Sequence, residues 1–84
     1  MKMLDCVEVT VEKAQYAREG VHKGMQGWIC FDDRNDVGWL VNFPQYGEKA
    51  DIAEITIMEE DLRIIPMMDA RVNERIKALY EGQI

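Results

Sequence analysis

The sequence predicts a mainly β fold, in which five short strands form a small barrel and one amphipathic helix follows at the C-terminus. Three observations lead to this prediction. Apolar residues alternate with polar ones in several short segments, as in strands that bury one face. Glycine, proline, aspartate and asparagine separate these segments at short intervals. Near the C-terminus the apolar spacing changes to three and four residues, which is typical of a helix.

Length and composition are those of one globular domain. The chain has 84 residues, and a chain of this size buries only about 60% of the surface that its unfolded form exposes. Its 48% apolar and 31% charged residues differ from the composition of disordered proteins. We therefore expect a single domain over residues 1–84, with the barrel at residues 6–65 and the helix at residues 69–81. A multidomain enzyme and a disordered tail are excluded.

The first strand is predicted over residues 6–11, where valines at alternate positions share one face. Residues 12–19 contain few helix breakers and suit a helical turn. Gly20 and Gly24 then require a connector, because glycine permits the backbone angles of tight turns.

The second and third strands are predicted over residues 25–31 and 37–43. The third has the clearest pattern, with four apolar residues on one face. Residues 32–36 form a turn between the two strands, because aspartate and asparagine side chains bond their own backbone. Pro44 ends the third strand, since proline cannot donate to a sheet.

The fourth strand is predicted over residues 52–58 and the fifth over residues 62–65, with three acidic residues between them that suit a helical turn. This arrangement of five short strands matches a small SH3-like barrel. The helix over residues 69–81 has Asp69 as its N-cap and ends near Gly82.

The strand pattern assigns a complete core to the barrel interior: Val7, Val9, Val11, Ile29, Phe31, Val37, Trp39, Val41, Phe43, Ile55 and Ile57. A second apolar set falls on the outward faces of the strands: Trp28, Cys30, Leu40, Ile52 and Met58. The leading interpretation is that the C-terminal helix covers this set with its own apolar residues, Val72, Ile76, Leu79 and Tyr80. Self-association or a partner are the other two interpretations, and in these Trp28 and Leu40 form the interface.

Acidic residues are concentrated in one part of the chain. The net charge is -6, whereas residues 32–61 alone hold nine acidic and two basic residues, a net charge of -7. The plain interpretation is a solvated surface. The functional hypothesis is that acidic loops converge on one side of the barrel and attract a basic protein partner. We expect contacts to this partner at Asp32, Asp33, Asp36, Glu48, Asp51, Glu59, Glu60 and Asp61, with Tyr46 as an aromatic anchor.

The sequence offers little for catalysis. It contains no serine, and its one histidine, His22, lies in a glycine-flanked turn; whether His22 approaches Cys30 is left open. The acidic turn at residues 32–36 is followed by neither the glycine at position six nor the glutamate at position twelve of an EF-hand. We expect no enzymatic activity, no metal and no cofactor.

Cysteine use and hydropathy indicate a cytoplasmic protein. Cys6 and Cys30 have no second pair and no histidine partners for a zinc site, so we expect two ordinary thiols. No apolar run approaches the roughly 20 residues that span a bilayer, and the N-terminus lacks the apolar stretch of a secretory signal.

The most motif-like stretch is residues 20–29, in which a basic residue and a glycine, two further residues and another glycine precede a β-forming pair. This order resembles the KOW-type turn and strand of SH3-like barrels in ribosomal and transcription-elongation proteins. Residues 7–65 as a whole resemble small uncharacterised bacterial proteins with an SH3-like barrel. The resemblance implies that fold, and it implies nucleic-acid or ribosome-associated binding as an alternative function. Arg18, Lys23 and His22 are too few basic groups for a surface that tracks phosphates.

The leading functional hypothesis is a non-enzymatic protein-binding module in a bacterial or phage setting. It would cover a basic surface of a nuclease or nucleic-acid-binding target, as acidic inhibitors and immunity proteins do. This hypothesis rests on size, charge and fold class. A homo-oligomer is a third alternative.

Overall fold

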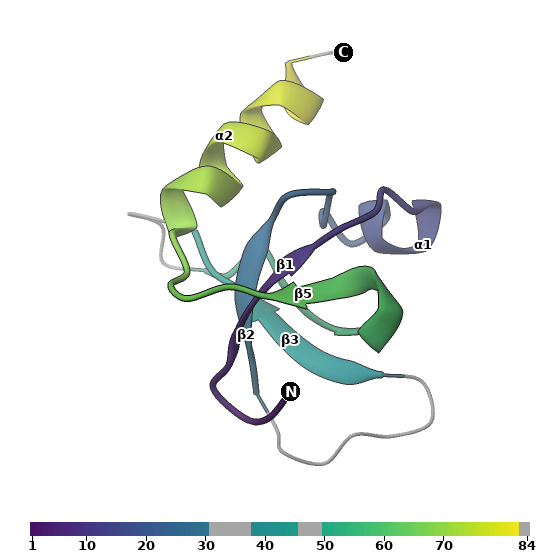
Figure 1. The fold of residues 1–84 in the computed structure, drawn as a ribbon. Helices are drawn as coiled ribbons and strands as arrows, with labels where there is room; N and C mark the ends of the chain where they lie inside the picture. Colours follow the sequence, from purple (N-terminus) through teal and green to yellow (C-terminus); the bar gives the residue numbers. More distant parts are fainter. Residues whose placement is uncertain (31–37, 46–49, 83–84) are drawn as a thin grey trace.

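In a computed structural model of the chain, the structure describes residues 1–30, 38–45 and 50–82. A five-stranded sheet and a C-terminal helix dominate this part of the chain (Figure 1). The strands are β1 (Cys6–Val9), β2 (Gln26–Ile29), β3 (Trp39–Phe43), β4 (Ala53–Ile57) and β5 (Leu62–Ile64). The helices are α1 (Ala14–Ala17), the 3-10 helix η1 (Glu59–Asp61) and α2 (Ala70–Glu81). Each of these strands and helices lies inside a range that the sequence predicts for a strand or a helical segment, respectively.

All four strand pairings are antiparallel, and the strand order is β4-β3-β2-β1-β5. β1 therefore lies between β2 and β5: Val7 is opposite Gly27 on one side and opposite Ile64 on the other. The mainly β class and the C-terminal helix are confirmed. The predicted closure into a barrel is not seen among the pairings of the described residues, which form one open sheet with β4 and β5 at its edges.

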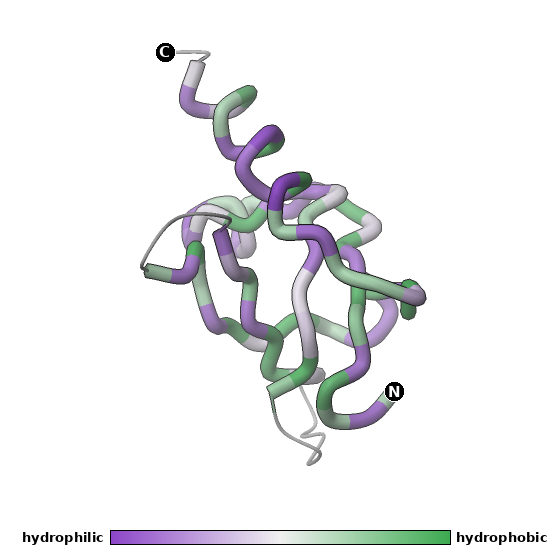
Figure 2. Tube along the Cα trace, turned by 90° about the vertical axis from the view of Figure 1, so that its left-hand side faces the viewer, coloured by the Kyte–Doolittle hydropathy of each residue, from purple (hydrophilic) through white to green (hydrophobic). Residues whose placement is uncertain are grey.

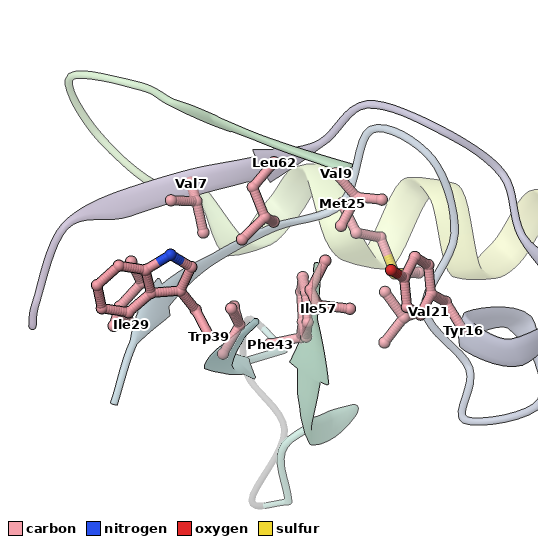
Figure 3. Close-up of a cluster of buried hydrophobic side chains, with 11 residues drawn as sticks. Val7, Val9, Tyr16, Val21, Met25, Ile29, Trp39, Phe43, Ile57 and Leu62 are labelled. Atoms are coloured by element: carbon pink, nitrogen blue, oxygen red, sulfur yellow. The ribbon is translucent and has the colours of Figure 1, made fainter. Parts of the chain in front are cut away.

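The core lies on the face of the sheet that the alternating pattern predicts, and Figure 2 shows hydrophobic and hydrophilic residues alternating along the strands. The predicted core residues that are fully or almost fully buried are Val7, Val9, Ile29, Trp39, Val41, Phe43 and Ile57. Val11 and Ile55 are partly buried against them, while Phe31 and Val37 lie outside the described residues. The cluster extends from Trp39 and Ile29 at one end to Tyr16 and Val21 at the other (Figure 3).

Two glycines in the stretch from residue 20 to residue 29 meet distinct backbone requirements. Gly24 has a φ of 91°, in the left-handed region that side chains rarely adopt. Gly27 sits in β2 where a Cβ atom would lie 2.1 Å from the backbone oxygen of Asn42. Any side chain at Gly27 would therefore force β2 and β3 apart. The predicted tight turn is present, and the structure adds a close approach of β2 and β3 at Gly27.

A polar side chain attaches α2 to the sheet. Asn73 is fully buried, and its amide bonds both the N–H and the C=O of Gln26, each at 2.7 Å, and the C=O of Pro44 at 2.8 Å. The Gln26 side chain in turn accepts from the N–H of Asp69 at 2.8 Å. Asp69 caps α2 as predicted, because its carboxylate accepts from the N–H of Arg71 at 2.9 Å. At Gln26, Asn73 thus makes the backbone hydrogen bonds that a neighbouring strand would otherwise make.

With this attachment, one residue of the outward apolar set stays uncovered. The helix leaves the sheet at one end (Figure 1), and Trp28 keeps 36% of its surface exposed. The expectation that α2 covers the whole outward set is therefore wrong for Trp28. Of the predicted apolar face of α2, Ile76 packs against the core, but Leu79 remains 64% exposed. The side of α2 that faces the sheet carries the buried Asn73 together with Ile76, and Leu79 lies outside it. No helix among the described residues has the length and apolar character needed to cross a membrane.

Candidate functional site

An exposed tryptophan lies in the middle of the outward face of the sheet. Trp28 on β2 is opposite Cys6 on β1 and Asn42 on β3, and Asn42 is opposite Glu54 on β4. Residues directly opposite each other in an antiparallel pair point to the same side of the sheet. The four side chains therefore form one row across the outward face, and Leu40 lies on the same face two residues before Asn42.

Two carboxylates are fixed at the β4 end of this row. The Sγ of Cys30 donates to Oε1 of Glu54 at 3.3 Å, and the Nδ2 of Asn42 donates to Oδ2 of Asp51 at 2.7 Å. Glu54 and Asp51 are both exposed. We call this surface the Trp28 face, and it consists of Trp28, Cys30, Leu40, Asn42, Asp51 and Glu54.

Cys30 acts on the Trp28 face as a hydrogen-bond donor. Partial burial and the bond to Glu54 raise the pKa of its thiol to about 11. The thiolate is the nucleophilic form of cysteine, so Cys30 is a weak nucleophile at neutral pH. Cys6 and Cys30 are both free thiols.

The carboxylates of the Trp28 face differ from several others in having no cationic partner among the described residues. Elsewhere, ion pairs join Lys13 to Asp61, Arg63 to Glu8, Arg71 to Asp69 and Lys77 to Glu81. Within the described parts of the chain, no lysine or arginine forms an ion pair with Asp51 or Glu54. The charges of Asp51 and Glu54 are therefore not paired with a cation among these residues.

The predicted contact residues fall into three groups. Asp51, Glu59 and Glu60 are exposed, and Glu59 also accepts from the Nε1 of Trp39 at 2.9 Å. Asp61 is buried. The remaining predicted contacts lie outside the described residues: Asp32, Asp33, Asp36, Tyr46 and Glu48.

Asp61 belongs to a buried network instead of an exposed surface, so the prediction of a contact role is wrong for this residue. It is 3% exposed and binds the Nζ of Lys13 at 2.7 Å and the hydroxyl of Tyr16 at 2.6 Å. The Tyr16 oxygen also accepts from the N–H of Met58 at 3.2 Å. Burial alone would raise the pKa of Asp61, but the bonds from Lys13 and Tyr16 outweigh it and hold this pKa below its usual value.

A second arrangement, absent from the sequence prediction, surrounds His22. Its Nδ1 lies 2.7 Å from Oε2 of Glu12, and its ring stacks on Tyr80 with 3.5 Å between the centroids. The stack borders a cleft of about 580 Å³ beside α2, whose lysine, Lys77, bonds Gln45 at 2.8 Å. Tyr80 is far from Glu12 and His22 in the sequence, so no local pattern could indicate the stack.

A Cys/His pair is not formed. His22 precedes β2 and bonds Glu12, whereas Cys30 follows β2 and bonds Glu54. In the described residues no three histidine, cysteine, aspartate or glutamate side chains are placed to hold one metal ion.

No family model, curated protein or solved structure matches this chain.

Proposed function

We propose that this protein is a non-enzymatic binding module that recognises a basic protein surface with the Trp28 face and the acidic residues around it. One observation carries the proposal: an exposed aromatic side chain stands beside fixed carboxylates that have no cationic partner among the described residues. Exposed aromatic groups are enriched where proteins bind each other, and uncompensated negative charge speeds encounter with a basic partner.

For the fold we propose an SH3-like barrel of the small bacterial type. Two features support it: the 3-10 helix directly before the last strand, and the pairing of that strand with β1. The turn at Gly20 and Gly24 and the close approach at Gly27 support a KOW-type element within it.

For the partner we favour a nuclease or nucleic-acid-binding protein, inhibited or neutralised when its basic surface is covered. Such proteins carry positive substrate sites because they bind phosphates. The concentration of negative charge in residues 32–61 supports this class. The KOW-like alternative, binding of RNA, would instead use Arg18 and Lys23 at the turn, which are both exposed.

The test measures binding of the purified protein to an immobilised basic ribonuclease, an acidic protein of similar size and a single-stranded RNA, at low and at physiological salt. We expect binding to the ribonuclease alone, with slower association at the higher salt. The double variant Asp51→Asn with Glu54→Gln should slow association. A matched variant on α2, Glu74→Gln with Glu81→Gln, removes the same charge and should have a smaller effect. Binding to RNA in preference to the ribonuclease, or equal effects of the two variants, would overturn the proposal.

A further inference from the structure

The Trp28 face combines an aromatic ring with carboxylates, which is a chemistry that selects among basic groups. Trp28 is 36% exposed on the outward face of the sheet, two residues after Gln26, where Asn73 attaches α2. From this geometry we infer that Trp28 receives an arginine side chain of the partner, while Glu54 and Asp51 bind a second basic side chain. The inference rests on the proposed function, and it names the chemistry of the segment that the Trp28 face binds.

The tryptophan ring favours arginine over lysine. The face of an indole attracts cations, and the planar guanidinium stacks on it with little loss of hydration. A lysine ammonium is more strongly hydrated and presents no plane to the ring. Among the described residues no cation lies over the Trp28 ring, and the one cation-π contact found there joins Lys13 to Tyr16.

The two carboxylates are oriented before any partner arrives. Glu54 uses Oε1 to accept from Cys30, and Asp51 uses Oδ2 to accept from Asn42. In each carboxylate the second oxygen makes no hydrogen bond with another described residue, and both side chains are exposed. A pre-oriented acceptor loses little freedom on binding, so it stabilises a charged donor more than a mobile side chain would.

The spacing of the row indicates the form of the bound segment. Trp28 and Glu54 are separated by β3, so their backbones lie about 10 Å apart. In an extended segment, alternate side chains share a face and are separated by roughly 7 Å. The length and flexibility of basic side chains cover the difference between these two spacings. The best match is therefore an extended segment with arginine and a second basic residue two positions apart.

The experiment uses three seven-residue peptides of serine and glycine that carry arginine, lysine or glutamate at the third and fifth positions. Binding to the full chain is followed by NMR titration. The chain has two tryptophans, and Trp39 is 6% exposed with its indole nitrogen bonded to Glu59, so its indole signal is an internal control. We expect the Trp28 indole signal to shift with the arginine peptide while the Trp39 signal stays in place. The arginine peptide should bind about fivefold more tightly than the lysine peptide.

Variants separate the roles of the ring and of the charges. Trp28→Ala should abolish the difference between the arginine and lysine peptides, and Trp28→Tyr should restore part of it. Both variants change the partly exposed Trp28, and a thermal melt checks that each variant is folded. If Trp28→Ala does not fold, the peptide preference of Trp28→Tyr and the indole shifts of the wild-type protein test the inference. Asp51→Asn with Glu54→Gln should weaken both basic peptides alike.

The outcomes distinguish this inference from the proposed function. If the arginine and lysine peptides bind equally and Trp28→Ala leaves both unchanged, the inference fails and the acidic binding module stands. If neither basic peptide binds better than the glutamate peptide, the proposed function fails as well. A Trp28 indole shift that appears on concentrating the protein alone would identify a second copy as the occupant and overturn the inference.

Discussion

The Asp61 network and the Trp28 face place the same kind of group, a carboxylate, in two opposite situations. Asp61 is almost fully buried and receives hydrogen bonds from Lys13 and Tyr16. Glu54 is exposed and receives one bond, from the Cys30 thiol. A buried charge requires partners because its hydration is lost, whereas an exposed one keeps water as its partner. Asp61 is therefore committed to the fold, whereas Glu54 keeps one oxygen without a hydrogen bond to another described residue.

The largest expected effect is on stability, at the buried carboxylate. Asp61→Asn removes the charge that Lys13 and Tyr16 bind, and hydrogen bonds to charged groups contribute roughly 1.5 to 3 kcal/mol each. We expect the free energy of unfolding to fall by about 2 kcal/mol, measured by urea denaturation. The neighbouring exposed residue supplies the control, since Glu60→Gln should change stability by less than about 0.5 kcal/mol. Equal losses in the two variants would remove the distinction between the regions.

A smaller effect is expected from pH on the wild-type protein. The pKa of Asp61 is lowered in the folded state from 3.8, because the bonds from Lys13 and Tyr16 outweigh the effect of burial. A carboxylate of this kind stabilises the fold above its unfolded pKa, and the contribution is lost as the pH falls through the lower, folded pKa. Stability should therefore decline as the pH drops below about 3.8, and the decline should be shallower in Asp61→Asn. Parallel pH profiles of the two proteins would contradict this assignment.

The smallest effect concerns the Trp28 face, and the quantity measured is the alkylation rate of Cys30. In a Cys6→Ser background, Cys30 should react slowly with iodoacetamide at pH 8, because burial and the bond to Glu54 raise its pKa to about 11. Glu54→Gln removes a neighbouring negative charge, so alkylation should become a few fold faster. The same variant should leave thermal stability nearly unchanged, since Glu54 is exposed. An unchanged alkylation rate would show that Glu54 does not approach Cys30 in solution.

Local patterns predicted the elements and most of the core. Alternation identified the buried valines of β1 and the inward residues of β3, because side chains of a strand point to opposite faces at every step. The helical period and Asp69 identified α2 and its N-cap. These features depend on neighbours within a few residues, so a single sequence contains them.

The site was less predictable. Acidic composition placed Asp51 and Glu60 correctly at the surface, but it also placed Asp61 there. The burial of Asp61 depends on Lys13 and Tyr16, which are more than forty residues away in the sequence. The same is true of Asn73, a polar residue that no apolar pattern selects and that anchors α2 to β2.

Periodicity, turn chemistry and composition are local properties, so they indicate the strands, the helix and the excess of negative charge in the middle third of the chain. Which carboxylates are bonded inside the molecule and which side chains stay uncovered depends on the tertiary fold. Asn73 attaches α2 to β2, and Trp28 stays exposed next to Asn42 and in one row with Glu54. The physical reason is that strand register and helix docking bring distant residues together, and this contact determines whether a charge is paired or open to a partner.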